Sequence, residues 1–466
     1  MAAKSPSEWW AVAPGAFLVC GVGTVGSSVG DGPGGVGSCD HGPGADMKFL
    51  AVTRRAYLGD IYLSLIRDGH EVRVFADPLP NISAFGGIIP LVGPWRDHLE
   101  WVGHDGIVFF EGVGIGRVQD ELRARGFRVI GGSELGDRLE QDRAYGQSVL
   151  AELGLPIAWS KGFANPAEAL AWLAANPDIY VLKFDNNAYT TFVGNHPTGA
   201  DVAFVLRRRA DAGGVLLMEK LRGVEVGIGA YFDGRKFLMP ACIDYEHKRF
   251  FPGDLGEMTG EMGTLASYDG AEHLFQATLG RVAPLLAGTG HVGYVNLNLI
   301  VDERGPFPLE FTCRIGNPGY AVLAAMQVDG WGDLFSRMVA RDADGFRTRP
   351  GYSVAIVLTV PPFPATWDDD PDEDIPTFYV TEPGASELGN YHWVDMRRDE
   401  AGQLLCLRRS GHIMIVTGTG LDVATAQTAA RRRAENVVAP ELRWRADIGD
   451  RYVTGERETL RRLGWL

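Results

Sequence analysis

From Met47 onward, apolar segments of strand length alternate with apolar segments of helix length, and this alternation constrains the fold more than any other feature. In chain order, we expect a strand at Phe49–Val52, a helix through Ile61–Ile66 and a strand at Glu71–Phe75. A strand at Gly106–Phe110, a helix near Val118–Arg125 and a strand at Phe127–Ile130 follow. Units of strand, helix and strand place their strands parallel, with the helices packed on the sheet. The first part of the chain therefore predicts an α/β domain.

After Pro156 the pattern changes to short strands with tight turns, as at Asp233-Gly234, which predicts an antiparallel-rich α+β module. Its strands are expected at Tyr180–Phe184, Val215–Glu219, Val226–Phe232 and Lys236–Ala241. Beyond Arg349, a smaller third unit is expected, with strands at Tyr352–Val360, Leu404–Leu407 and His412–Thr417 and a helix at Asp422–Val437. No internal repeat is visible.

Residues 1–46 differ from the rest because they are rich in glycine and lack apolar periodicity, which predicts disorder. Gly21-Val-Gly-Thr-Val-Gly26 has the spacing of a dinucleotide-binding loop, but no strand precedes it and no helix pattern follows. We therefore do not interpret it as a nucleotide site. Because a strand-like segment directly follows Met47, a start codon assigned too far upstream would explain this leader.

Charge and cysteine content exclude several classes of function. The chain has 44 Lys plus Arg against 59 Asp plus Glu, and its net charge of -15 argues against nonspecific binding to nucleic acid or anionic lipid. No apolar run approaches the roughly 18 residues of a membrane span. The five cysteines form no C-x-x-C pair, so neither a disulfide framework nor a structural zinc site is indicated. These features predict a cytoplasmic protein that binds neither nucleic acid nor a membrane.

Charged residues interrupt the central module at points where phosphate chemistry fits. Lys183 ends an apolar strand, where a buried ammonium is costly unless an anion such as phosphate meets it. Glu219 and Glu225 flank a turn glycine further on. The segment Glu246-His-Lys-Arg249, followed by Gly253-Asp254, suits an anion-binding surface. Each of these features alone is also typical of a solvated surface.

The most informative segment places Asn298 and Glu310 twelve residues apart, on two expected strands joined by a turn at residues 302–305. Antiparallel pairing would bring the two side chains together, with Thr312 on the same face as Glu310. Oxygen ligands of this kind suit Mg²⁺ together with water and substrate phosphates. Arg314 lies two residues further along this face, where it can meet a phosphoryl group. From spacing alone, an accidental polar face of an exposed sheet remains the alternative.

Together, these segments resemble the ATP-grasp superfamily, and within it the glycinamide ribonucleotide synthetases (phosphoribosylamine–glycine ligases), over residues 47–466. Glu246-His-Lys-Arg249 and Thr259-Gly-Glu-Met-Gly263 are similar to the family's D-H-K-R and T-G-G-M-G. The run Leu309–Pro318 is similar to L-E-F-N-C-R-F-G-D-P. Near the C-terminus, Ser410–Gly420 and Trp444–Gly449 are similar to G-G-R-V-L-x-V-T-x-x-G and Y-R-x-D-I-G.

The resemblance implies a multidomain α/β and α+β protein with an ATP-grasp fold, an N-terminal parallel-sheet domain and a small C-terminal domain. The expected parts are a glycine-rich leader (1–46), an N-terminal α/β substrate domain (47–145), an ATP-grasp domain (146–348, with a lid subdomain at about 156–222) and a C-terminal α+β domain (349–466). The implied activity uses ATP to convert a carboxylate, glycine in the family, into an acyl phosphate that the amine of phosphoribosylamine attacks in purine biosynthesis. Small-molecule carboxylate and amine substrates are the implied partners, and a monomer or homodimer is expected.

The resemblance also implies roles for particular residues. Those expected to bind ATP are Arg143 and Lys183 at the phosphates, Glu219 and Leu221 at the adenine, and Glu225 at the ribose. Those expected to hold Mg²⁺, with Mn²⁺ as an alternative, are Asn298, Glu310 and Thr312. The expected catalytic residues are Arg314 at the acyl phosphate and Lys248 and Arg249 near the carboxylate substrate. The expected substrate-binding residues are Arg54, Arg55 and Asp254.

The sequence departs from the family pattern at both glycine-rich loops. Thr53–Asp60 replaces G-G-R-E-H-A, and Asn187–Val193 replaces the A-A-G-K-G-V lid, so the glycines that let backbone N–H groups approach phosphate are missing. Asn317 and Gly319 stand where the family has acidic residues, which predicts weaker Mg²⁺ binding. Two alternatives therefore stay open: a diverged ligase that joins another acid and amine, and a non-catalytic nucleotide-binding relative.

Overall fold

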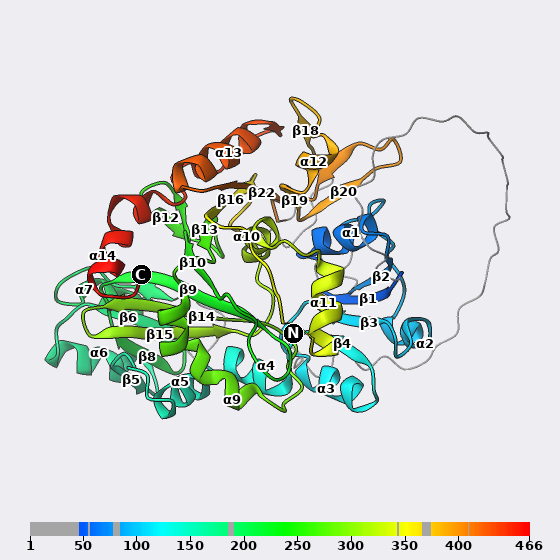
Figure 1. Ribbon diagram of the computed structural model, residues 1–466. Helices are drawn as coiled ribbons and strands as arrows, with labels where there is room; N and C mark the ends of the chain where they lie inside the picture. The colour runs from blue at the N-terminus through cyan, green and yellow to red at the C-terminus, as the bar shows by residue number, and fades with distance from the viewer. Residues whose placement is uncertain are drawn as a thin grey trace, which may run out of the picture. The chain divides into compact units, whose positions relative to one another are not determined.

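The computed structural model describes residues 46–54, 56–77, 84–184, 191–342, 344–365, 374–408 and 410–466. Within it, Met47–Leu466 form one compact unit, whose elements run from blue to red in Figure 1. Apart from Asp46, the leader for which disorder is predicted lies outside the described residues.

The first part of the fold is a parallel sheet with the strand order β2-β1-β3-β4. Its strands are β1 (Lys48–Thr53), β2 (Glu71–Ala76), β3 (Ile107–Phe110) and β4 (Arg128–Ile130), and its main helices are α1 (Gly59–Arg67), α2 (Leu99–Val102) and α3 (Gly116–Ala124). The all-parallel pairing confirms the predicted α/β sheet. Since the chain leaves β1 and β3 in opposite directions along the sheet, their carboxyl ends form a topological switch point, where ligands commonly bind.

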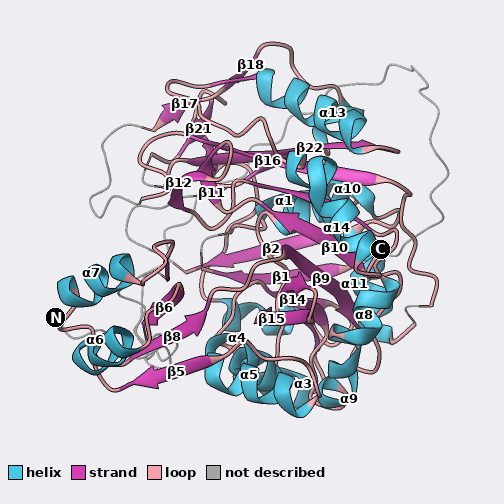
Figure 2. Ribbon diagram, turned by 90° about the vertical axis from the view of Figure 1, so that its left-hand side faces the viewer, coloured by secondary structure: helices cyan, strands magenta, loops and turns pink. Residues whose placement is uncertain are grey.

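A second, smaller sheet is antiparallel, in the order β5-β8-β6-β7. Its strands are β5 (Ser160–Phe163), β6 (Tyr180–Phe184), β7 (Phe192–Val193) and β8 (Val215–Glu219). Helices α6 (Pro166–Ala175) and α7 (Ala200–Arg208) lie beside these strands in Figure 2 and share a separate apolar core with them. Lys183 lies on β6 and Glu219 ends β8.

The largest sheet has eight antiparallel strands in the order β15-β14-β9-β10-β13-β16-β22-β19. Its strands are β9 (Val224–Phe232), β10 (Cys242–Glu246), β13 (Gly263–Ser267), β14 (Gly293–Asp302), β15 (Gly305–Thr312), β16 (Tyr352–Thr359), β19 (Tyr391–Trp393) and β22 (His412–Gly420). Because β13 pairs with β16, the sheet continues across the predicted boundary at residue 349. The central and C-terminal parts therefore share one backbone hydrogen-bond ladder.

One expected strand is absent from this part of the structure. The prediction for Lys236–Ala241 is wrong, since only Phe237 makes an isolated bridge, to Phe232. Pro240 has no N–H to donate to a ladder, which accounts for the interruption. The other predicted strands and the C-terminal helix, α13 (Val423–Glu435), are confirmed within a few residues.

Shorter elements complete the described chain. The strands are β11 (Arg249–Phe251), β12 (Leu255–Met258), β17 (Ile375–Pro376), β18 (Phe378–Tyr379), β20 (Met396–Arg398), β21 (Leu404–Cys406) and β23 (Val437–Val438). The helices are η2 (Trp95–His98), α4 (Glu134–Gln141), α5 (Arg143–Glu152), α8 (Glu272–Ala277), η3 (Leu279–Val282), α9 (Ala283–Leu286), α10 (Gly319–Met326), α11 (Trp331–Ala340), α12 (Ala385–Leu388), η4 (Tyr452–Glu456) and α14 (Arg457–Arg462).

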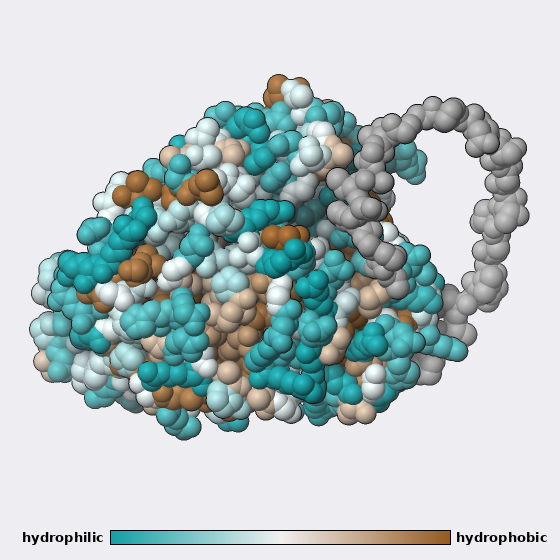
Figure 3. Space-filling model, viewed as in Figure 1, coloured by the Kyte–Doolittle hydropathy of each residue, from teal (hydrophilic) through white to brown (hydrophobic). Residues whose placement is uncertain are grey.

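The length and apolar character of the helices bear on membrane insertion, and one face of the surface is drawn in Figure 3. None of the helices in the described part of the chain combines the length and apolar character needed to cross a bilayer. On the face drawn in Figure 3, hydrophilic residues cover much of the surface and hydrophobic residues gather only in small groups. Scattered exposed apolar residues of this kind are normal on a folded protein.

Candidate active site

The hairpin of β14 and β15 carries the oxygen side chains at the centre of the site. Asn298 lies directly opposite Glu310, and Asn296 lies opposite Thr312, in the antiparallel register that the spacing predicts. Since side chains alternate across a strand, Glu310 and Thr312 share one face, while Phe311 is buried on the other. The hairpin thus places an amide, a carboxylate and a hydroxyl side by side.

Two cationic side chains approach this hairpin from other elements. Arg143 begins α5 and donates from Nη2 to the Glu310 carboxylate at 3.1 Å. Lys183 comes from β6 of the smaller sheet. Burial lowers the pKa of Lys183 to about 8, and the charges of Arg143 and Lys248 lower it too, whereas Glu310 raises it. The charges of Arg143, Lys248 and Glu310 therefore act on Lys183, and a phosphate group bound beside Lys183 would also be attracted by Arg143.

Lys248 is held by carboxylates from two neighbouring strands. Its Nζ lies 2.8 Å from Glu225 on β9 and 3.1 Å from Glu246 on β10. Burial alone would lower the pKa of Lys248, but these two carboxylates raise it well above its ordinary value. Glu225 also accepts a hydrogen bond from Asn298 Nδ2 at 3.3 Å. Lys248 is therefore charged at neutral pH and linked to the Glu310 hairpin.

Arg314 follows β15 and is oriented by a residue that the sequence did not single out. Its Nε donates to Glu140 on α4 at 3.1 Å, and Glu140 also accepts the Cys313 N–H at 2.8 Å. Burial raises the pKa of Glu140, and the positive charge of Arg314 opposes this. Glu140 thus holds both the backbone and the guanidinium at the end of β15. In the sequence, Glu140 is recognisable only as an acidic residue near the end of an amphipathic helix.

The residues predicted to line the adenine pocket lie between the four-stranded antiparallel sheet and the eight-stranded sheet. Glu219 accepts the Trp159 N–H at 2.8 Å and pairs with Arg304 at 3.1 Å. Leu221 is buried in a small apolar cluster with Ala158 and Phe307. A purine placed here would meet an apolar surface beside backbone groups and a carboxylate.

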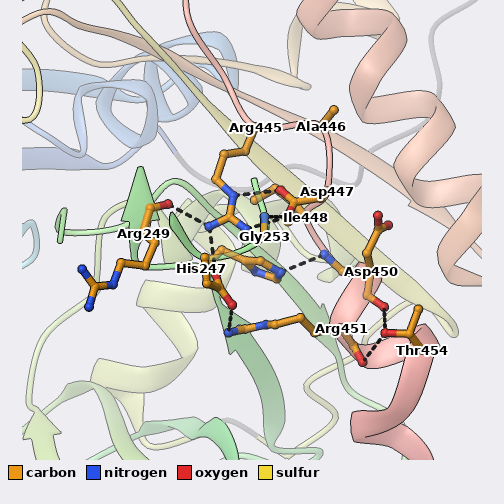
Figure 4. Close-up of polar contacts among 12 residues, drawn as sticks. His247, Arg249, Gly253, Arg445, Ala446, Asp447, Ile448, Asp450, Arg451 and Thr454 are labelled. Atoms are coloured by element: carbon orange, nitrogen blue, oxygen red, sulfur yellow. Dashed lines mark hydrogen bonds and ion pairs between the residues drawn. The ribbon is translucent and has the colours of Figure 1, made fainter. Parts of the chain in front are cut away.

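The structure does not bring every predicted residue to this point. Arg249 donates to the Gly256 carbonyl within its own β11–β12 hairpin, and Figure 4 shows its guanidinium turned away from the surrounding contacts. Asp254 is occupied by Arg445 and Arg451. Neither residue lies with Lys248 and Glu310. Their placement differs from the prediction because charged residues adjacent in sequence need not face the same side of an extended segment.

The predicted substrate-binding residues near the N-terminus, Arg54 and Arg55, follow β1 of the parallel sheet. Arg54 follows β1, is exposed, and lies 4.0 Å from Asp77, whereas Arg55 is outside the described residues. At the same edge, the Tyr62 hydroxyl donates to Glu111 at 2.6 Å. The loop turns at Ala56, whose φ of 51° lies in the left-handed region that usually favours glycine.

The C-terminal motif Trp444–Gly449 holds the segment that carries Lys248. We call Arg445, Asp447, Gly449 and Arg451 the C-terminal clamp; Figure 4 labels Arg445, Asp447 and Arg451. Arg445, which has no exposed side-chain surface, donates to the Arg249 carbonyl at 2.8 Å and pairs with Asp254 at 3.0 Å and Asp447 at 2.7 Å.

The other members of the clamp hold the same segment from both ends. Asp447 accepts the Gly253 N–H at 2.8 Å, and Arg451 donates to the Glu246 carbonyl at 2.7 Å. The Gly449 N–H donates to His247 Nε2 at 3.2 Å, so this ring nitrogen must be unprotonated. Burial lowers the pKa of His247 to about 4, and the charges of Arg451 and Arg445 lower it too. Because residues 246–254 are fixed at several points, the position of Lys248 depends on the clamp.

A cavity of about 250 Å³ opens beside the Glu310 hairpin. Residues from β10, β13, β14, β15 and α10, and from the segments that follow β10, precede β13 and follow β15, line it: Cys242, Asp244, Glu246, Lys248, Gly260, Glu261, Thr264, Tyr294, Asn296, Asn298, Glu310, Thr312, Arg314, Gly316, Asn317, Gly319, Val322 and Leu323. The cavity extends from Glu310 and Arg314, beside which a phosphate would bind, to strands β10 and β13 of the eight-stranded sheet. A small substrate bound here would lie next to a phosphate held by Lys183 and Arg143.

The oxygen side chains of the hairpin fit a magnesium–nucleotide complex. Asn298 Oδ1 is buried and accepts no hydrogen bond from the described residues, and Glu310 and Thr312 lie beside it. Within the described chain, no three His, Cys, Asp or Glu side chains are grouped as a metal site made by protein alone would require. Mg²⁺ bound with a nucleotide needs only one or two carboxylates, since waters and phosphates supply its other ligands.

Comparisons with known proteins show which proteins the chain resembles. Residues 141–320 match the model of the phosphoribosylglycinamide synthetase ATP-grasp (A) domain. The phosphoribosylamine–glycine ligase of Synechocystis sp. is 26% identical over 343 residues, which cover 71% of this chain and 80% of that protein. The Streptomyces coelicolor enzyme of the same name is 28% identical over 351 residues, with 71% and 80% covered.

A solved structure supports the fold. The crystal structure of the phosphoribosylamine–glycine ligase from Thermotoga maritima aligns with a TM-score of 0.63 and 20% identity, covering 86% of this chain and 100% of that one. The domain match and the fold indicate an ATP-grasp enzyme. Within that class, residues 141–320 match the phosphoribosylglycinamide synthetase ATP-grasp domain, and the chain is similar to phosphoribosylamine–glycine ligases, which form a C–N bond.

Proposed function

We propose that this protein is an ATP-dependent carboxylate–amine ligase that joins glycine to phosphoribosylamine. The observation that carries the proposal is the convergence of Lys183 from β6, Arg143 from α5, and Glu310 and Arg314 from β15 and the segment after it, beside a cavity large enough for a small acid. The relatives named phosphoribosylamine–glycine ligase support this choice of substrates. The alternative of a non-catalytic relative is not favoured, because the groups that would bind and transfer phosphate lie together.

In the proposed reaction, one carboxylate oxygen of the acid attacks the γ-phosphorus of ATP, and ADP leaves. The amine nitrogen then attacks the carbonyl carbon of the acyl phosphate, inorganic phosphate leaves, and the nitrogen loses a proton. Lys183 and Arg143 hold the phosphates, while Arg314, oriented by Glu140, stabilises the charge on the transferred group. Lys248 holds the carboxylate of the acid, so the reacting atoms stay aligned.

Glu310, Asn298 and Thr312 are the residues that would hold Mg²⁺, with Mn²⁺ as an alternative. A bound divalent ion would neutralise phosphate charge and so favour nucleotide binding. Arg143 lies 3.1 Å from the Glu310 carboxylate and balances its charge. We also propose that the protein acts in the cytoplasm as a monomer or homodimer.

A thermal-shift experiment tests the nucleotide site. We expect ATP to raise the melting temperature of the wild-type chain only when Mg²⁺ is present, and we expect this shift to be lost in Glu310→Gln and kept in Arg314→Met. A shift that is independent of Mg²⁺, or equal in Glu310→Gln and wild type, would contradict the assigned roles. Glu303→Gln, at a largely exposed carboxylate on the turn between β14 and β15, is the matched control.

The lowered pKa of Lys183 predicts a pH dependence of ATP binding. With a pKa of about 8, Lys183 is charged below pH 8 and loses its proton above it. The Kd for Mg-ATP should therefore rise by about tenfold per pH unit above 8. Lys183→Arg keeps its charge throughout this range, so its Kd should stay nearly flat between pH 7 and 9. Parallel calorimetric titrations of the two proteins test this, and identical pH profiles would show that Lys183 does not meet the phosphates.

A further inference from the structure

The cavity beside the Glu310 hairpin contains more carboxyl groups than its cations can pair with. Lys248 is already shared by Glu225 and Glu246, and Arg314 is paired with Glu140. Two further carboxylates, Asp244 and Glu261, line the cavity and make no ion pair among the described residues. Both are at least nine-tenths buried, with 6% and 9% of their surface exposed.

The unpartnered atoms of this cavity are hydrogen-bond acceptors. Asp244 Oδ1 and Glu261 Oε1 are buried and have no hydrogen-bond partner within the described chain. The hydroxyl of Thr264, a residue in the same lining that is 1% exposed, also has no partner there. Buried acceptors without partners are costly, and their gathering in one cavity calls for a ligand rich in N–H donors.

The backbone makes room for the Asp244 carboxylate. Asp244 on β10 lies opposite Gly227 on β9, and a Cβ at Gly227 would come within 2.3 Å of Asp244 Oδ1. Its other oxygen accepts from Asn296 Nδ2 at 2.9 Å, which fixes the orientation of the carboxylate. Asp244 is therefore built into the cavity wall.

Glu261 lies in the loop before β13, at a position where the family motif T-G-G-M-G has glycine. Burial raises the pKa of Glu261 well above its ordinary value, and the nearby charges of Glu246 and Asp244 raise it too. Burial likewise raises the pKa of Asp244 to about 7. An organic cation would relieve this repulsion. The described chain offers no group of three acidic, His or Cys ligands for a metal ion.

We propose that Asp244 and Glu261 bind a positively charged nitrogen group, so that this enzyme accepts amino acids with a second ammonium group in addition to glycine. This inference rests on the proposed function, because it assigns the cavity to the acid substrate. The reacting carboxylate would stay near Lys248 and Arg314, while the second ammonium would reach the inner wall of the cavity. One ammonium group, as in glycine, balances only one of the two carboxylates.

Binding of 2,4-diaminobutyrate and homoserine to the full chain tests the proposal. The two probes have the same number of heavy atoms and differ at the end of the side chain, which is an ammonium in one and a hydroxyl in the other. In the wild type with a non-hydrolysable Mg-ATP analogue, we expect diaminobutyrate to bind at least about tenfold tighter than homoserine, as a charge-assisted hydrogen bond in a buried site predicts. Glu261→Gln and Asp244→Asn should each reduce that preference about tenfold.

Glu257→Gln is the matched control, since it removes an exposed carboxylate from β12 in the same segment and should leave the preference unchanged. Melting temperatures and affinity for the ATP analogue identify any variant that fails to fold. Equal affinity of the two probes in the wild type, or an unchanged preference in both folded variants, would overturn the proposal. Failure of the proposed ligase reaction would instead appear as absence of ADP release with glycine, independent of these binding ratios.

Discussion

Replacing Arg445 with methionine is expected to lower the free energy of unfolding by about 3–5 kcal/mol, the range for breaking a buried ion pair. The guanidinium of Arg445 has no exposed surface and contacts Asp447, Asp254 and the Arg249 carbonyl. Methionine keeps much of the volume but leaves these acceptors with fewer donors. Equilibrium urea unfolding followed by circular dichroism measures the change.

Arg462→Met is the control for this substitution. Arg462 lies 3.6 Å from Glu303, and both side chains are largely exposed, so we expect a change within about 0.5 kcal/mol. If Arg445→Met also stayed within about 0.5 kcal/mol, the C-terminal clamp would not stabilise the fold. A folded Arg445→Met protein should in addition show weaker binding of the acid substrate, because the clamp positions Lys248.

The second large effect concerns turnover. Arg314→Met should lower kcat for ADP formation by about 10²–10³-fold, as is typical for losing one group that stabilises transition-state charge. The Kd for Mg-ATP should change little, because Lys183 and Arg143 hold the nucleotide phosphates. Single-turnover kinetics with saturating Mg-ATP separates the two quantities.

Two further variants define the role of Arg314. Glu140→Gln should reduce kcat less than Arg314→Met and should leave the Arg314 charge in place, since Glu140 acts by orienting the guanidinium. Arg117→Met, at an exposed arginine on α3, should leave kcat unchanged. An Arg314→Met enzyme that keeps wild-type kcat would remove Arg314 from the mechanism.

The parts of the site that the sequence predicted are those that depend on local geometry. Strand alternation and a short turn were enough to place Asn298 opposite Glu310, and the structure confirms that pairing. The helix at α13 was predictable for the same reason, since Asp422 caps it by accepting the Thr425 N–H. These features require only neighbouring residues.

The parts that were missed depend on contacts between distant segments. Arg445 meets Arg249 and Asp254 across nearly two hundred positions, and no local pattern indicates such a partner. Glu140 likewise contacts Arg314, which follows β15, from the distant helix α4. Asp244 was not singled out in the sequence, because the glycine that makes room for it lies on β9. The sequence shows which side chains are charged. It does not show that Arg445 and Asp244 are buried and Glu140 half-buried, and their burial determines what they can bind.

The most direct test of the central claim is ADP release by the full chain supplied with Mg-ATP, glycine and freshly generated phosphoribosylamine, with the product identified by mass. We predict ADP formation that requires all three substrates and a product with the mass of glycinamide ribonucleotide. ADP formation no greater than in the reaction without glycine, or ADP without a product of that mass, would contradict the assignment of this protein as a glycine-joining ligase.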